Sequence, residues 1–496
     1  MRYLIGIDIG TSSTKSVLMD EGGTVRAAAQ EEYGIRAPKP GWAEQDPQTW
    51  WRATCATVRG VLRTSGVDPK AIAGVGLSGQ MHGTVLLGKD RRVLRPAIIW
   101  ADQRSAEQCR RIRELVGREQ WARWTANPVA PGFMAASLVW LREREPKVFE
   151  RTAAVLLPKD YVRWRLTEEM ASDVSDAAST LLFDVAHRRW SGEVLKALDL
   201  PETLFPSVLE SAQIAGKIGR EASKETGLAV GTPVAAGGGD QPVAAVGNGI
   251  IAPGRVLSTI GTGGQLFAPL PSPTYDPQLR THTFCHAVPD RWFLMGAMLS
   301  AGLALRWFRD QIAGTSYEKL SEKAAQIPPG SEGLIFLPYL IGERTPHMDP
   351  KARGVFFGLT LQHSSAHLAR AIMEGVAFAL RDALEIFREL GVRTDRIVAS
   401  GGGAQSPVWR QIQADVFHSE LVRVHGEERA GVGAALLAGI GTEVYEGFEH
   451  ACRVAVRYGD HTVPIEAHAA RYDRLYEVFR GLYPKLKDDF ARIGDV

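Results

Sequence analysis

The first thirty residues alternate short apolar runs with tight turns. Tyr3 to Ile9 is the first run, Thr14 to Asp20 the second and Thr24 to Ala29 the third. Gly10-Thr11-Ser12-Ser13 separates the first two runs, and Gly22-Gly23 separates the second from the third. Runs of this length between glycine-rich turns predict a three-stranded meander.

The same pattern returns in the second half of the chain. Arg255 to Ile260 predicts a strand, Gly261 to Gly264 a turn, and Gln265 to Ala268 the strand that leaves it. The tripeptide Ile-Gly-Thr stands in the first turn and again at 260–262. We interpret this as a duplication, which predicts two similar domains with a boundary near Ile251 to Gly254.

Helix-like and strand-like segments alternate after the second hairpin. The pattern predicts a helix from Ser364 or Ser365 to about Leu390, a strand over 396–400 and a helix over 407–417. Such alternation predicts an α/β fold.

A chain of 496 residues is too long for one ordinary core. We predict an N-terminal domain over 1–250, a C-terminal domain over 251–445 and a C-terminal helical extension over 446–496. The last helical stretch, roughly 467–493, is expected to serve packing and to be broken or kinked at Pro484.

Composition narrows the classes of function. The 58 Lys and Arg residues nearly balance the 56 Asp and Glu residues, which argues against a dedicated nucleic-acid or membrane-surface binder. No signal peptide or membrane-spanning run is visible, and the four cysteines are scattered. These features predict a reduced, cytoplasmic protein without a structural zinc.

Three short motifs suggest functions that their context disfavours. Gly74, Gly76 and Gly79 match the spacing of a dinucleotide-binding turn, but a loop follows them where a helix is required. The segment 83–89 resembles a phosphate-binding P-loop, but its middle is strand-like and an acid follows its lysine. Cys285-His286 has no second pair at ligand spacing, so a packed position in a hairpin is favoured.

Asp8 lies at the end of the first apolar strand, where a carboxylate is costly unless it is paired or near a cation. The turn after it offers backbone N–H groups and the hydroxyls of Thr11, Ser12 and Ser13. This turn suits the binding of phosphate, and the carboxylate of Asp8 at its base suits the binding of a metal ion. A polar hairpin tip is the alternative, and the second copy at Gly261-Thr262 favours the phosphate interpretation.

Asp240 follows three glycines and precedes a predicted helix. An ionised acid there is stabilised by the helix and could accept a hydroxyl proton, whereas a plain N-cap is the alternative. Gly401-Gly402-Gly403 offers a flat backbone surface for an adenine or ribose, although a tight strand–helix turn explains it equally well.

A mixture of polar, aromatic and soft side chains suits a polyhydroxy ligand. These residues form two short groups, Gln80-Met81-His82-Gly83 and the alternating Trp100, Asp102 and Arg104.

Nine segments together make the chain resemble the FGGY carbohydrate kinases, over about residues 3 to 440. They are Gly6 to Lys15, Trp42 to Trp51, Gly79 to Gly83, Leu94 to Arg104, Leu156 to Tyr161, Ala171 to Ala178, Gly237 to Asp240, Phe336 to His347 and Gly354 to Thr360. The pair GQMHG and GERTPH distinguishes this group from the glycerol kinases. The resemblance implies two ribonuclease H-like domains of the actin/hexokinase superfamily, with a catalytic cleft between them.

The resemblance also assigns roles to residues at matching positions. Asp240 is implied as the proton acceptor, and Asp8 as an acid near the metal and the phosphates. The remaining assignments are sugar contacts by Gln80, Met81 and His82 with Trp100 and Asp102 nearby, phosphate contacts by Gly10, Thr11, Ser12, Ser13, Gly261 and Thr262, and adenosine contacts by Gly402 and Gly403. Mg²⁺ is expected near Asp8 and Asp240, through water.

The expected reaction is in-line transfer of the γ-phosphoryl group of ATP to a ketopentose, D-xylulose first. Ribulose, gluconate or a tetritol is the alternative acceptor, and an actin-like ATPase is the rival from another class. The expected partners are the sugar and ATP, without nucleic acid or membrane; a homodimer is left open.

Overall fold

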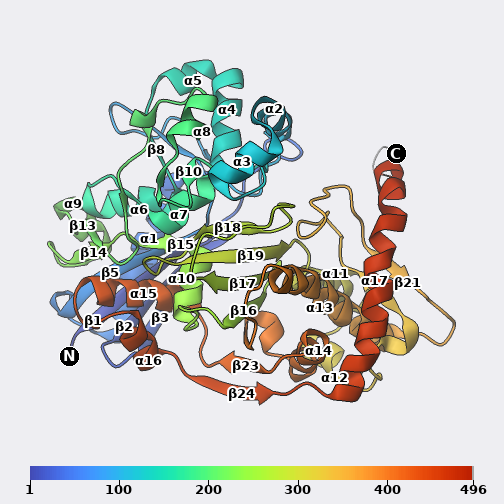
Figure 1. Cartoon of the computed structure of the whole chain (residues 1–496). Coiled ribbons are helices and arrows are strands. Elements are labelled where there is room, and N and C mark those ends of the chain that lie inside the picture. Colours follow the sequence, from blue (N-terminus) through green and yellow to red (C-terminus); the bar gives the residue numbers. More distant parts are fainter. Residues whose placement is uncertain (494–496) are drawn as a thin grey trace.

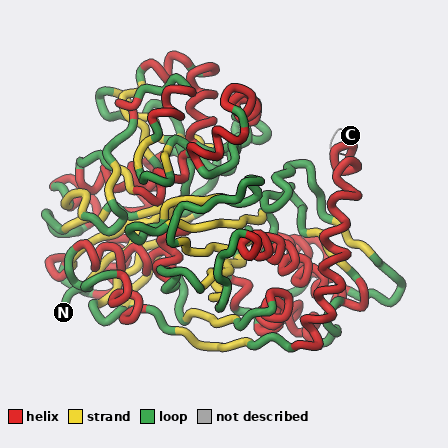
Figure 2. Tube along the Cα trace, in the orientation of Figure 1, coloured by secondary structure: helices red, strands yellow, loops and turns green. Residues whose placement is uncertain are grey.

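The computed structural model describes residues 1–493 and confirms the α/β class. Two large mixed sheets of seven strands each organise the chain. Figure 2 shows their strands crossing the middle of the molecule with helices gathered around them. The N-terminus and the C-terminal helix lie at opposite sides of the view in Figure 1.

The N-terminal sheet has the order β13-β14-β5-β1-β2-β3, with β15 also paired to β5. Its strands are β1 (Tyr3–Ile9), β2 (Ser13–Asp20), β3 (Val25–Glu32), β5 (Ile72–Gly79), β13 (Ile214–Lys217), β14 (Pro233–Ala235) and β15 (Gly238–Gly239). The predicted meander is therefore confirmed, with β3 extending beyond the expected end at Ala29.

The C-terminal sheet has the order β18-β19-β17-β16-β22-β23-β24. Its strands are β16 (Arg255–Ile260), β17 (Gly264–Leu270), β18 (His282–Cys285), β19 (Trp292–Met298), β22 (Arg396–Ser400), β23 (Leu421–Val424) and β24 (Tyr458–Thr462). In both sheets the first strand pairs antiparallel with the next strand of its hairpin and parallel with a later strand. This shared pairing confirms that the hairpin arrangement recurs, while the duplication of whole domains stays a prediction.

Helices surround the two large sheets, and several short strand pairs lie outside these sheets (Figure 1). The helices are α1 (Pro47–Ser65), α2 (Ala106–Val116), α3 (Arg118–Thr125), α4 (Met134–Arg144), α5 (Pro146–Glu150), α6 (Pro158–Thr167), α7 (Val174–Ala177), α8 (Gly192–Ala197), α9 (Arg220–Thr226), α10 (Asp240–Gly247), α11 (Gly302–Phe308), α12 (Tyr317–Ala325), α13 (Ser365–Glu389), α14 (Pro407–Phe417), α15 (Arg429–Gly441), α16 (Phe448–Ala455) and α17 (Glu466–Ile493). The small strand pairs are β4 (Glu44–Gln45) with β7 (Ala97–Ile98), β6 (Val85–Gly88) with β8 (Thr152–Leu156), β9 (Ser172–Asp173) with β12 (Val208–Leu209), β10 (Phe183–Asp184) with β11 (Arg189–Trp190), and β20 (Ile335–Leu337) with β21 (Val355–Phe357).

The glycines that mimic a dinucleotide-binding motif serve helix packing. Helix α15 lies against β1 and β5, although it follows the C-terminal strands in sequence. A Cβ atom at Gly76 would come within 1.9 Å of the Ala434 carbonyl oxygen, and one at Gly6 within 1.8 Å of the Gly431 carbonyl oxygen. Only glycine permits this approach, because any side chain would overlap the helix backbone.

The other two disfavoured motifs are likewise structural. The P-loop-like segment forms β6, and Arg91 N donates to the Gly88 carbonyl oxygen at 2.9 Å in the turn that follows. Cys285 ends β18, and the His286 ring is bonded through Nε2 to the Ile250 carbonyl oxygen at 2.9 Å. All four cysteines are free and buried. Within residues 1–493, none of the helices has the length and apolarity needed to cross a membrane.

Of the predicted break or kink at Pro484, the break is wrong, and the kink stays a prediction. Helix α17 continues through this proline, which is exposed. Tyr476, Phe479 and Leu482 before the proline and Phe490 after it are buried. Both halves are therefore held by packing, which offsets the hydrogen bond that a proline removes. Residues 494–496 of the predicted extension lie outside the described residues.

Candidate active site

Asp8 lies near the end of β1, between β2 and β5. Ser78 Oγ donates a 2.8 Å hydrogen bond to Asp8 Oδ1, and Lys15 stands opposite Asp8 across the hairpin. The Lys15 ammonium is itself paired with Glu428 at 3.0 Å. Burial raises the pKa of Asp8, while Ser78 and Lys15 oppose that rise. The carboxylate therefore lacks a cation of its own, as a metal-binding acid would.

The turn after Asp8 presents polar groups on a braced backbone. Gly10 N donates to Ser13 O at 3.0 Å, and Gln45 Nε2 donates to Thr11 O at 2.7 Å. The Ser12 side chain is exposed and Thr11 partly so. This geometry offers hydroxyls and N–H groups to a ligand while the turn stays fixed.

A hydrogen-bond network joins this turn to the predicted sugar residues. Trp100 Nε1 donates to Thr11 Oγ1 at 2.8 Å. Gln80 Nε2 donates to Gln45 Oε1 at 2.8 Å, and Gln80 Oε1 lies 3.4 Å from Thr11 Oγ1. Gln80 and Gln45 are buried, so they act as braces between the turn and the loop after β5.

His82 has a fixed ring in a positive-φ backbone. Its φ is 73°, and its Nδ1 lies 2.8 Å from the Ser179 carbonyl oxygen. A carbonyl oxygen only accepts, so Nδ1 carries the proton and Nε2 is left as an acceptor in the neutral ring. Burial lowers the pKa of His82 to about 3. The neutral ring can therefore accept a hydrogen bond from a ligand hydroxyl.

Asp240 is the first residue of α10 and directly follows β15. The N-cap is Gly239, without a side-chain capping bond, so the alternative of Asp240 as a plain N-cap is wrong. Burial, and then the charge of Asp8, raises the pKa of Asp240 to about 7. The strand register agrees with this influence, because Asp8 of β1 and Gly238 of β15 both pair with Ser78 of β5. A carboxyl that titrates near neutral pH suits proton transfer.

Met81 connects the sugar loop to Gly239, the residue before Asp240. A Cβ atom at Gly239 would come within 2.8 Å of Met81 Cγ. Gly239 N also donates to Ser175 Oγ at 3.2 Å, and Ser175 Oγ donates to Asp173 at 2.6 Å. The backbone before Asp240 is thus held by packing on one side and by a buried polar group on the other.

Asp102 is fully buried, and its carboxylate is already engaged. Arg104 Nη2 lies 2.8 Å from Asp102 Oδ2, and Ala43 N donates to the same oxygen at 2.6 Å. Its assignment as a residue near the sugar remains a prediction; here it anchors the loop that carries Trp100.

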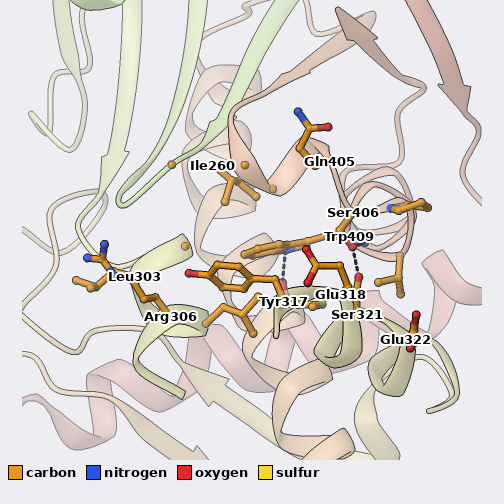
Figure 3. A pocket seen from close by; sticks show the side chains of 18 of the residues that line it. Ile260, Leu303, Arg306, Tyr317, Glu318, Ser321, Glu322, Gln405, Ser406 and Trp409 are labelled. Atoms are coloured by element: carbon orange, nitrogen blue, oxygen red, sulfur yellow. Dashed lines mark hydrogen bonds between the residues drawn. The ribbon is translucent and has the colours of Figure 1, made fainter. Parts of the chain in front are cut away.

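A cavity of about 720 Å³ lies in the C-terminal half (Figure 3). The predicted phosphate and adenosine residues line it together, namely Gly261, Thr262, Gly402 and Gly403. Trp409 and Ile260 add apolar surface, and the Ser321 and Ser406 hydroxyls lie 2.5 Å apart at its edge. An apolar slot that adjoins a glycine-rich turn suits a base followed by phosphates.

Sequence reasoning missed several residues of this cavity. Trp409, Leu303, Tyr317 and Ser321 line it from three helical segments. Trp409 lies in the first turn of a helix that the sequence predicted, but neither spacing nor composition separates it from a core tryptophan. Within residues 1–493, no hydrogen bond joins the turn at Gly10 to the turn at Gly261.

Comparison with known proteins identifies the family. Residues 3–247 match the N-terminal domain of the FGGY family of carbohydrate kinases, and residues 256–442 match its C-terminal domain. The chain belongs to this family and is a carbohydrate kinase.

Three relatives illustrate the similarity. A xylulose kinase of Escherichia coli is 41% identical over 97% of this chain and 99% of its own. The crystal structure of a xylulose kinase from Brucella ovis superposes with a TM-score of 0.91 at 38% identity, covering 98% of this chain and 100% of its own. A gluconokinase of Bacillus subtilis is 31% identical over 99% of this chain and 98% of its own.

Substitutions at two neighbouring glycines of the cavity should have different effects, one on ATP binding and the other on stability. A Cβ atom at Gly402 would meet only Ile260 O, at 3.9 Å, whereas one at Gly403 would lie 2.6 Å from Ile260 Cβ. We expect Gly402→Val to fold normally and to raise KM for ATP at least about 10-fold, because its side chain occupies the cavity. Gly403→Ala should instead lower Tm. Steady-state kinetics and thermal melting separate the two, and an unchanged KM for ATP in Gly402→Val would place the nucleotide elsewhere.

Proposed function

We propose that this carbohydrate kinase transfers the γ-phosphoryl group of ATP to D-xylulose, giving D-xylulose 5-phosphate. The observation that carries the proposal is the group around Asp240: burial and then the charge of Asp8 raise the pKa of its carboxyl to about 7, and the preceding residue, Gly239, packs against Met81. A base, a phosphate-side acid and a sugar-side residue are the parts that such a transfer requires.

In the proposed mechanism Asp240 accepts the proton of the sugar's terminal hydroxyl while the oxygen of that hydroxyl attacks the γ-phosphorus. The bond from that phosphorus to the ADP oxygen breaks in line, and ADP leaves. The turns at Gly10–Ser13 and Gly261-Thr262 donate hydrogen bonds to phosphate oxygens, which carry the charge in a loose transition state. The sugar is oriented by His82 Nε2 and by Trp100.

Mg²⁺ fits the residues present. Asp8 and Asp240 supply oxygen ligands. Burial raises the pKa of both, and the charge of Asp8 adds to the rise at Asp240, so a dication beside them would stabilise their charged forms. Within the described residues no group of three or more acidic, His or Cys side chains could hold a metal. This suits Mg²⁺ held mainly by phosphates and water, with these two carboxylates nearby. When bound, the ion would neutralise charge on the phosphates.

Other acceptors are the alternatives within the same reaction. The similarity to the xylulose kinases of E. coli and Brucella supports xylulose as the acceptor. The similarity to the gluconokinase of Bacillus subtilis makes gluconate the main alternative acceptor. The rival from another class, an actin-like ATPase, would hydrolyse ATP whether or not sugar is present.

The test is coupled ADP release with D-xylulose, D-ribulose, L-ribulose, gluconate, erythritol and glycerol as acceptors. D-xylulose and D-ribulose differ only in the configuration of one hydroxyl. Since one misplaced hydrogen bond is at stake, kcat/KM should favour D-xylulose by at least about 10-fold. His82→Ala should erode this preference and raise KM for the sugar, with KM for ATP nearly unchanged, because the hydroxyl contact is lost. A better acceptor would overturn the assignment to xylulose, and release that no sugar stimulates would contradict the transfer reaction.

A further inference from the structure

A buried helical segment contacts both the sugar loop and the strand that leads to the base. It comprises Asp173, helix α7 (Val174–Ala177) and the 3-10 turn Ala178–Thr180, and we call it the bridging segment. All of its residues are buried. Figure 1 shows α7 beside β15, which ends at Gly239, and the two elements are in contact. The bridging segment is therefore placed to act on the residues that precede Asp240.

One end of the bridging segment holds the backbone in front of the base. Ser175 Oγ accepts a 3.2 Å hydrogen bond from Gly239 N and donates one of 2.6 Å to Asp173 Oδ2. A Cβ atom at Gly238 would lie 2.7 Å from Ser175 Oγ, so the hydroxyl reaches β15 only because no side chain stands there. Gly239 is the N-cap of α10, and Asp240 is its first residue. The Ser175 hydroxyl therefore helps to fix the backbone that carries Asp240.

The other end of the bridging segment holds His82. The His82 backbone N donates to Ser179 Oγ at 3.2 Å, and the ring Nδ1 lies 2.8 Å from Ser179 O. Ser179 Oγ in turn donates to Asp176 Oδ1 at 3.4 Å. A positive φ, which is 73° at His82, is unfavourable for a residue with a side chain and persists only where surrounding contacts hold it. Ser179 supplies two such contacts, so it fixes both the backbone and the ring of His82.

Lys159 joins the two ends of the bridging segment. Its ammonium lies 2.8 Å from Asp173 Oδ1 and 3.5 Å from Asp176 Oδ2, and all three residues are fully buried. Burial lowers the pKa of Lys159, but the charges of the surrounding acids outweigh burial and raise that pKa overall. The ammonium is thus held between the acid bonded to Ser175 and the acid bonded to Ser179. A buried ion pair tolerates little displacement, because separated charges would lack water.

From these contacts we propose that the bridging segment is a positioning element for phosphoryl transfer. Ser175 positions the base through the Gly239 backbone, and Ser179 positions His82. Each serine acts through the residue that it holds rather than on the sugar or ATP. The inference rests on the proposed function, in which Asp240 takes the sugar proton and His82 accepts from a sugar hydroxyl. Two serines of one segment should therefore control different kinetic constants.

Ser175→Ala should lower kcat with D-xylulose at least about 10-fold, because the Gly239 N–H loses its acceptor and the base is no longer held in place. KM for D-xylulose and KM for ATP should stay within about twofold, since both binding surfaces remain. Coupled ADP release measures all three constants.

Ser179→Ala should show the opposite pattern. KM for D-xylulose should rise at least about fivefold, because the His82 backbone loses a hydrogen-bond acceptor and its ring is less well oriented. The preference for D-xylulose over D-ribulose should fall as well. The values of kcat and of KM for ATP should stay within about twofold, since the contact of Ser175 with Gly239 is intact.

Ser211→Ala is the matched control. Ser211 is as fully buried as Ser175, and its hydroxyl donates to the same oxygen, Asp173 Oδ2, at 2.8 Å. Among the hydrogen bonds of the described residues, the Ser211 hydroxyl has none with Gly239 or with His82. Each of the three alanine variants removes a buried hydroxyl, so Tm should fall by similar amounts. Only Ser175→Ala and Ser179→Ala should change the kinetics.

A fall of kcat in Ser211→Ala equal to that in Ser175→Ala would overturn the proposal, because turnover would then follow stability rather than the contact with Gly239. The same kinetic change in both active-site serine variants would overturn it too. If D-xylulose does not stimulate ADP release by wild type, the proposed function fails and this inference with it. If wild type phosphorylates D-xylulose and both serine variants keep wild-type constants, only this inference fails.

Discussion

Asp240→Asn should lower kcat by at least about 10²-fold, the usual contribution of a positioned general base. Asparagine keeps the size and the hydrogen-bonding oxygen of the side chain but cannot take the sugar proton. KM for ATP should change little, because Asp240 does not line the cavity that contains Gly402 and Gly403. Steady-state ADP release measures both constants.

Asp382→Asn is the matched control. Burial also raises the pKa of Asp382 to about 7, but its carboxylate accepts a 2.7 Å bond from Tyr476 between α13 and α17. Turnover should survive in this variant. Near-normal turnover in Asp240→Asn as well would contradict the assignment of Asp240 as the base.

The pH dependence adds a second signature. The pKa of Asp240 is about 7 in the folded chain, so kcat/KM for the sugar should rise about 10-fold per pH unit up to about pH 7 and then level off. The pKa of Asp240 in the folded chain lies above its ordinary value of 3.8, so protonation of Asp240 stabilises the folded chain at low pH. This stabilisation is lost as pH rises through 7. Both asparagine variants should therefore gain Tm relative to wild type above pH 7, and only Asp240→Asn should lose turnover.

Local patterns were enough to predict the two hairpins. Their strands and turns are contiguous in sequence, and the structure pairs Ile9 with Thr14 and Ile260 with Gly264. The helix from Ser365 was predictable for the same reason, since Ser364 and His367 cap it reciprocally. In each case the physical cause lies within a few residues of its effect.

Contacts between distant segments were not predictable in this way. The glycines of β5 looked like a nucleotide motif because nothing in the local sequence reveals that α15 packs on them. The partners of Asp102, namely Arg104 and the Ala43 backbone, were not predictable either, because they are fixed only by the fold.

Asp8→Asn should lower kcat/KM for Mg·ATP about 10²-fold, the usual effect of removing one electrostatic stabiliser. Thr262→Val, which removes one neutral hydroxyl and keeps the shape, should cost less, because a charged partner is worth more than a neutral donor. The fold should tolerate Asp8→Asn, since the Ser78 hydroxyl can still donate to the amide oxygen and burial already disfavours the charge. Binding of sugar alone, measured by calorimetry, should survive both changes.

The residual activity of Asp8→Asn tests whether the two carboxylates act as a pair. The charge of Asp8 is one of the causes that raise the pKa of Asp240, so removing it should move the acid limb of the kcat/KM profile to below pH 7. A variant that loses activity without this shift would show that the acid limb belongs to another group. Loss of sugar binding with normal use of Mg·ATP would place Asp8 in the sugar pocket rather than beside the phosphates.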